Sequence, residues 1–170
     1  MEQNLDIAAT RKNYVDYLAH RPRVEKIGEH GLFTDEGEPV VLGQVQNQVA
    51  DHKGIVWTHV ISLRREDAAR LGYDSAVQWM ALLRSKRAML CKHMKIDSAN
   101  LKWYAAFHNE SHHPHVHLLV YSVKDGEGYL TKQSIEAMRS ELAHDIFRQD
   151  FANIYEEQAQ SRMDLKERSE

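Results

Sequence analysis

The sequence predicts an α+β fold, a two-layer sandwich in which helices pack on a mainly antiparallel central sheet. Three segments, 55–63, 101–108 and 115–123, are rich in the β-branched and aromatic residues that favour strands. A short loop, residues 109–114, separates the second strand from the third. Because such a short connection joins antiparallel neighbours, these two strands are expected to form a hairpin.

The first half of the chain begins with a predicted helix over residues 6–20, which Pro22 ends or redirects because proline cannot continue it. Residues 27–54 are rich in glycine and have little apolar periodicity. They predict a long, partly irregular excursion with a short strand near 40–42. The segment 55–63, IVWTHVISL, is expected to be a strand buried on both faces.

Two helices are predicted between the first strand and the hairpin. The first is short and covers residues 65–71. Asp74 or Ser75 can then cap a longer helix that continues to about Met94, since its apolar residues recur at helical spacing.

A last long helix is predicted after the hairpin. Glycines at 126 and 128 turn the chain, and Thr131 is placed to cap the helix. Its apolar stripe comprises Ile135, Met138, Leu142, Ile146, Phe147, Phe151 and Ile154. After Tyr155 the composition becomes polar, which predicts one domain over residues 1–158 and a polar tail or linker over 159–170.

Composition favours a cytoplasmic protein without a membrane partner. The N-terminus lacks the features of a signal peptide, and no apolar run approaches the length of a membrane span. The single cysteine, Cys91, fits a reducing compartment. A net charge of −3 argues against a protein that coats DNA. Even so, two basic stretches, within residues 11–26 and 84–95, are either phosphate contacts or solvated helix faces.

Five histidines lie within residues 108–117, which is the strongest signal in the chain: His108, His112, His113, His115 and His117. His115 and His117 are two positions apart on a predicted strand, so both project from one face. His108 ends the preceding strand and should lie beside His115 across the hairpin. The pattern predicts a three-histidine metal site with open coordination positions. Two alternatives are surface loop histidines and a purely structural metal.

An open three-histidine site acts as a Lewis acid or activates a nucleophile. Hydrolases that use zinc hydroxide, enzymes like carbonic anhydrase and non-haem oxygenases all fit this pattern taken alone. The rest of the chain must separate them.

Residues 108–122, HNESHHPHVHLLVYS, resemble the histidine–hydrophobic–histidine motif of HUH endonucleases, including Pro114 before the motif and His108 upstream. The segments NYVDYLAHRPRVEKIGEHGLF (13–33) and VWTHVISL (56–63) are similar to the MobL, or broadly MobP-type, relaxases. The helices around 76–87 and 134–150 are similar too. The resemblance therefore covers most of the chain and implies that the antiparallel sheet carries the HUH motif.

The resemblance implies a relaxase that nicks one DNA strand at a transfer origin and initiates conjugative transfer. A rolling-circle replication initiator would use the same chemistry. It implies that His108, His115 and His117 hold a divalent cation, magnesium or manganese, although imidazole ligands alone favour zinc, nickel or copper. A tyrosine would attack the scissile phosphate and keep the 5′ end as a phosphotyrosine. The implied partners are single-stranded DNA, relaxosome accessory proteins and a coupling protein.

Tyr17 is the preferred nucleophile, because YLAHR matches the tyrosine-plus-arginine segment of the family, and Tyr14 is the close alternative. The alternative for both is core packing. Arg21 is expected to hold a phosphate. His112 and His113 are spare donors suited to the scissile phosphate.

Four further residues complete the predicted site. His59 would orient the nucleophile or act as its base, or else be a core histidine. Glu110 would orient a metal-bound imidazole or lie exposed in the loop. Arg84 and Arg87 are candidate DNA contacts from the second basic stretch.

The chain departs from the family in one respect. Relaxases of this kind usually carry a strand before the tyrosine helix, and the residues before Tyr14 do not alternate like a strand. This predicts an N-terminally truncated domain. One alternative to an active relaxase is an impaired remnant that binds single-stranded DNA. A separate alternative is a metal-dependent hydrolase without a tyrosine nucleophile.

Overall fold

The computed structural model describes residues 2–150 and divides the chain into two compact units, residues 1–130 and 131–170. The expected polar tail, and the predicted helix positions Phe151 and Ile154, lie outside the described residues.

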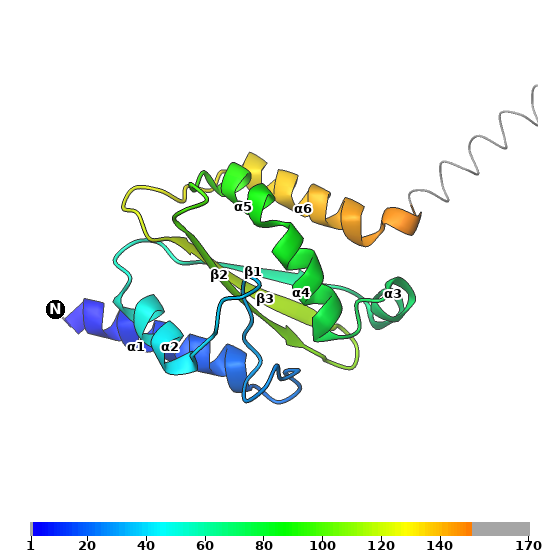
Figure 1. Cartoon of the computed structure of the whole chain (residues 1–170), viewed down its shortest axis with the longest axis horizontal. Coiled ribbons are helices and arrows are strands. Elements are labelled where there is room, and N and C mark those ends of the chain that lie inside the picture. Colours follow the sequence, from blue (N-terminus) through cyan, green and yellow to red (C-terminus); the bar gives the residue numbers. More distant parts are fainter. Residues whose placement is uncertain (1, 151–170) are drawn as a thin grey trace, which may run out of the picture. The chain divides into compact units, whose positions relative to one another are not determined.

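The first unit is built on an antiparallel sheet of three strands, β1 (Trp57–Ser62), β2 (Leu101–His108) and β3 (His115–Ser122), in the order β1-β3-β2. The predicted hairpin is confirmed, because β2 pairs with β3 along its whole length and ends with His108 opposite His115. Helices pack on this sheet, so the predicted α+β class is confirmed (Figure 1).

The sheet has two distinct faces, because side chains alternate along each strand. We call one the histidine face: it carries His115, His117, Leu119 and Tyr121 of β3. In the observed register Ala106 and Tyr104 of β2, and Val60 and Thr58 of β1, share that face. The opposite face carries Val116, Leu118 and Val120 of β3 with Trp103 and Phe107 of β2.

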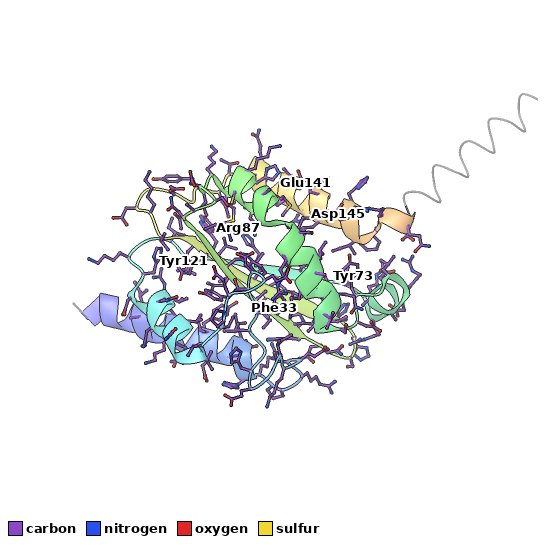
Figure 2. The ribbon with its side chains drawn as sticks, in the orientation of Figure 1. Phe33, Tyr73, Arg87, Tyr121, Glu141 and Asp145 are labelled. Carbon is purple, nitrogen blue, oxygen red and sulfur yellow. The ribbon has the colours of Figure 1, made fainter. Side chains whose placement is uncertain are left out.

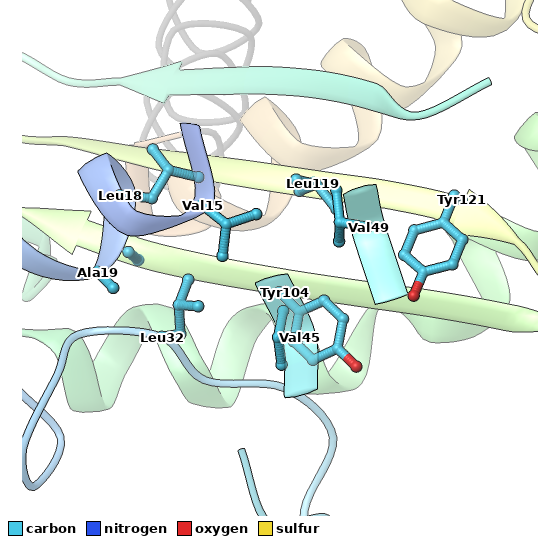
Figure 3. Packing of buried hydrophobic residues seen from close by; sticks show 10 residues of the cluster. Val15, Leu18, Ala19, Leu32, Val45, Val49, Tyr104, Leu119 and Tyr121 are labelled. Carbon is cyan, nitrogen blue, oxygen red and sulfur yellow. The ribbon is translucent and has the colours of Figure 1, made fainter. Parts of the chain in front are cut away.

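Helices α1 (Glu2–His20) and α2 (Leu42–Asp51) cover the histidine face (Figure 1). Their buried side chains close over the sheet in one core cluster, shown in Figure 3: Val15, Leu18, Ala19, Leu32, Val45, Val49, Tyr104, Ala106, Leu119 and Tyr121. The predicted irregular excursion is confirmed for residues 27–41, but the strand expected at 40–42 is absent and Leu42–Asp51 form α2. Val45 and Val49, one turn apart, form the buried side of this amphipathic helix, which packs against α1.

Helices α3 (Arg65–Leu71), α4 (Ala76–Ser85) and α5 (Arg87–Met94) follow β1. The bounds of α3 are as predicted. Trp79 of α4 packs against Phe107 on the opposite face, with ring centroids 6.2 Å apart. The single helix expected to continue to Met94 was wrong, because it breaks at Lys86. The Ser85 hydroxyl donates to the Leu82 carbonyl, which competes with the regular helical hydrogen bonds at that point.

Strand β1 is a sheet edge and not a doubly buried strand, which corrects the prediction for 55–63. Its exposure alternates residue by residue, and Val60 on the histidine face is 60% exposed. The second unit contains α6 (Lys132–Ile146), capped as predicted by Thr131, whose hydroxyl accepts from the Ser134 amide. α6 ends at Ile146, so the predicted longer helix is interrupted at Phe147.

Candidate active site

Three histidine side chains converge on the histidine face at the end of the β2–β3 hairpin. His108 is fully buried, and His115 and His117 are half-buried. Their ring centroids lie 4.7 to 5.3 Å apart. Each offers one ring nitrogen, and these three nitrogens all lie within 4.8 Å of one another. The sequence predicted this convergence from the two-residue period of a strand and the short hairpin loop.

Backbone carbonyls fix the tautomers of two of these rings. Nε2 of His108 donates to the Leu18 carbonyl at 3.1 Å, which leaves the lone pair on Nδ1. Nδ1 of His115 donates to the His113 carbonyl at 3.0 Å, which leaves the lone pair on Nε2. A carbonyl behind a ligand imidazole is the usual way in which proteins orient a metal ligand.

Two buried nitrogens in this cluster have no hydrogen-bond partner within the part of the chain that the structure describes: Nδ1 of His108 and Nε2 of His117. Burial lowers the pKa of His108, and burial followed by the neighbouring His108 and His115 lowers the pKa of His117 to about 4. Both rings are therefore neutral near pH 7 with their lone pairs available. Buried, neutral and unpartnered imidazole nitrogens are the donor set that a divalent cation requires.

Two tyrosines from α1 lie against this cluster. The Tyr14 hydroxyl lies 3.3 Å from Nδ1 of His117. Tyr17 stacks on Tyr14, and its ring centroid lies 6.3 Å from that of His108 and 6.4 Å from that of His117. Tyr14 is half-buried, and burial followed by the charge of Tyr17 raises the pKa of Tyr14. Tyr17 is 43% exposed, so its phenol is open to an incoming substrate.

A group of charged side chains is linked to the Tyr17 hydroxyl through Arg21. Arg21, one turn further along the chain, donates to that hydroxyl. Glu110 forms ion pairs with both Arg21 and Arg23, each with a nitrogen–oxygen distance of 3.6 Å. Glu110 thus contacts arginines, in place of the metal-bound imidazole or the solvent that the sequence suggested. The sequence had marked Arg23 only as part of a basic stretch.

Arg65, at the start of α3, holds the loop between the histidines and had no predicted role. Its guanidinium donates to the Ser111 carbonyl at 3.1 Å, to the Asn109 side-chain oxygen at 2.7 Å and to the Glu110 carbonyl. Its amide donates to the His112 carbonyl at 3.1 Å. Sequence alone offers no signal for this residue, because the contact spans more than forty positions.

Three predicted site residues lie away from the cluster. His59 pairs with Leu118 in the register, so it projects from the opposite face, and its suggested role as a base or orienting group is corrected. Arg84 donates to the Thr34 carbonyl at 2.8 Å. Arg87, labelled in Figure 2, pairs with Asp35 and donates to the Leu101 carbonyl at 3.2 Å. These arginines bind segments of the protein itself, and a role toward DNA stays a prediction.

His112 and His113 lie in the hairpin loop with exposed side chains. The His112 carbonyl accepts from the Arg65 amide and the His113 carbonyl accepts from the His115 ring. The backbone of both residues therefore has a structural role in the loop. A role of their imidazoles toward a phosphate stays a prediction.

The arrangement can therefore hold a divalent cation at three converging imidazoles, beside an exposed phenol and a guanidinium. Such a combination suits transfer of a phosphoryl group to an oxygen nucleophile, because charge develops on phosphate oxygens and positive groups stabilise it.

The family model described as MobL relaxases matches residues 8–169. No curated protein and no solved structure matches the chain. No helix among residues 2–150 is long and apolar enough to cross a membrane.

Proposed function

The chain belongs to the MobL relaxase family, and we propose that it nicks single-stranded DNA through a 5′-phosphotyrosine formed by Tyr17. The observation that carries the proposal is the position of Tyr17. Its exposed phenol lies beside the three histidines and accepts a hydrogen bond from Arg21. A plain metal-dependent hydrolase has no need of a tyrosine in that place.

We assign the nucleophile to Tyr17 and a positioning role to Tyr14. The raised pKa of Tyr14 keeps its hydroxyl protonated, and that hydroxyl is engaged with His117. Tyr17 has an accessible oxygen next to a positive charge, which suits attack on a phosphodiester.

His108, His115 and His117 would hold a divalent cation, of which magnesium and manganese are the candidates. The two orphaned buried nitrogens and the two carbonyl-fixed tautomers support this fit. When bound, such a cation neutralises negative charge on the non-bridging oxygens of the scissile phosphate.

The residues of the chain itself carry out the nicking step. The Tyr17 oxygen attacks phosphorus and its proton passes to water, while the bond from phosphorus to the 3′ oxygen breaks. The 3′ oxygen leaves and takes up a proton as a free hydroxyl. The new phosphotyrosine ester conserves the phosphodiester energy, so a later 3′ hydroxyl can reverse the step. Arg21 holds the attacking oxygen in place throughout.

The partner of this chemistry is single-stranded DNA at a transfer origin, in the cytoplasm, with relaxosome accessory proteins and a coupling protein as further partners. Single-stranded DNA is bound through phosphate contacts and stacking on aromatic rings, and the affinity falls steeply with salt. The arginines near Tyr17 provide phosphate contacts, and the exposed tyrosine ring provides a surface for stacking.

The test is a covalent-adduct assay. The protein is mixed with manganese and end-labelled single-stranded oligonucleotides from transfer origins of related mobile elements, and the products are separated on a denaturing gel. Wild type and Tyr14→Phe should give a labelled band at the combined mass of protein and DNA. Tyr17→Phe and His115→Ala should give none.

Other results of this assay would support one of the alternative functions. An adduct lost in Tyr14→Phe and kept in Tyr17→Phe would exchange the roles of the two tyrosines. Cleavage that survives in the variant lacking both hydroxyls would indicate a hydrolase without a tyrosine nucleophile. Binding of DNA and metal without any adduct would indicate a remnant that only binds.

A further inference from the structure

We infer that the Glu110 carboxylate occupies the position between Arg21 and Arg23 at which a DNA phosphate binds. The incoming DNA strand must displace this carboxylate. This inference rests on the proposed function, since it takes single-stranded DNA as the ligand. It assigns Arg23 as a phosphate-binding residue and Glu110 as an electrostatic gate over Tyr17.

The contacts form one continuous chain that ends at the Tyr17 oxygen. Arg21 donates to that oxygen and also pairs with Glu110, and Glu110 pairs with Arg23. A single carboxylate is thus shared by two guanidinium groups. Two guanidinium groups around one anion are an arrangement that fits a phosphodiester as well as a carboxylate.

The ion pairs are loose enough to be exchanged. Both nitrogen–oxygen distances are 3.6 Å, which is longer than a hydrogen bond. The Glu110 side chain is 28% exposed and that of Arg23 is 57% exposed. Ion pairs as exposed as these contribute little to stability. A phosphate carried by a longer DNA strand can therefore compete with the carboxylate.

The left-handed backbone conformation of Arg23 supports a functional role for its side chain. Arg23 adopts φ 77°, the left-handed conformation that glycine takes without cost and that other residues take at a penalty. The surrounding backbone enforces it, because the Asn109 amide donates to the Arg23 carbonyl at 2.8 Å and Val24 bridges His108. Strained residues of this kind concentrate at functional sites.

The backbone of Glu110 is fixed as well, so the carboxylate is held at the site. Its amide donates to the His108 carbonyl at 2.9 Å, and its own carbonyl accepts from Arg65. The gate is therefore attached to the same hairpin as the three histidines.

The experiment measures binding alone, without metal. A fluorescein-labelled single-stranded oligonucleotide of mixed sequence is titrated with protein in EDTA, and anisotropy gives Kd over a series of salt concentrations. Glu110→Gln should bind roughly three- to tenfold more tightly, as expected when two partly exposed ion pairs no longer compete. Glu136→Gln, which removes the carboxylate of another exposed ion pair, is the control for net charge.

Arg23→Gly should bind more weakly, and the slope of log K against log salt should fall by about 0.7, the value for one lost contact to single-stranded DNA. Its thermal midpoint should stay the same or rise, because glycine relieves the backbone penalty. A purely structural Arg23 would instead give a lower midpoint with unchanged binding, and that result would overturn its assignment.

Unchanged or weaker binding by Glu110→Gln would overturn the gate. Because no covalent step is measured, the same shifts are expected in a Tyr17→Phe background. A negative adduct assay therefore does not contradict the binding role of Glu110 and Arg23. Likewise, unchanged binding by Glu110→Gln does not contradict the assignment of Tyr17 as the nucleophile.

Discussion

The Tyr14 hydroxyl lies 3.3 Å from Nδ1 of His117, across 103 positions of sequence. The contact joins the tyrosine helix α1 to the strand that carries two of the three histidines. Because Tyr14 engages Nδ1, it is Nε2 of His117 that remains for a metal ion. The two parts of the site thus depend on each other.

Tyr14→Phe should weaken metal binding by up to about tenfold, because an outer partner that orients a ligand imidazole is lost. At saturating manganese the DNA adduct should persist. Manganese titrations of the thermal midpoint measure the affinity, since an ion that binds only the folded state stabilises it. Tyr129→Phe, at a tyrosine 61% exposed, is the control. Unaltered metal affinity together with a lost adduct would make Tyr14 the nucleophile.

Metal-free protein should lose stability as the pH falls from about 6.5 toward 4. The pKa of His117 is about 4 in the folded state and near 6.5 in the unfolded chain. Between these values the unfolded state binds more protons, so the free energy of unfolding rises with pH and falls on acidification. His108, whose pKa burial also lowers, acts in the same direction.

The measurement is urea unfolding at a series of pH values. His117→Gln should have a shallower dependence on pH in this window than the wild type. Identical slopes for the two proteins would show that His117 does not titrate as its burial implies.

Arg65→Ala should loosen the hairpin loop, because it removes the donors to Ser111, Asn109 and Glu110. Amide hydrogen exchange over residues 109–113 should become faster, and metal affinity should fall because the His113 carbonyl orients His115. Arg70→Ala on the same helix, where Arg70 pairs with Asp67, is the matched control. Exchange in the loop that stays as slow as in the control would contradict this role.

Leu18→Ala should lower the free energy of unfolding by about 2–5 kcal/mol, because Leu18 is 1% exposed within the core between α1 and the sheet. Val77→Ala on α4, at a residue 66% exposed, should change it by at most about 0.5 kcal/mol. Denaturant unfolding measures both. Similar small effects of the two substitutions would contradict the packing of α1 on the histidine face.

The sequence by itself determined the β2–β3 hairpin and the grouping of His108, His115 and His117. Strand periodicity and a short loop are local properties, so spacing along the chain translates directly into position in space. The bounds of α3 and the cap of α6 were predictable for the same reason.

Only the tertiary structure decided which residues meet this cluster and which do not. The helical spacing of Val45 and Val49 is visible in the sequence, whereas their packing with α1 is decided by the fold. His59 projects from the opposite face because pairing of β1 with β3 sets its direction. The contacts of Glu110 with Arg21 and Arg23 join residues almost ninety positions apart. Such contacts depend on how the elements pack, and packing between distant segments leaves no periodic trace in a single sequence.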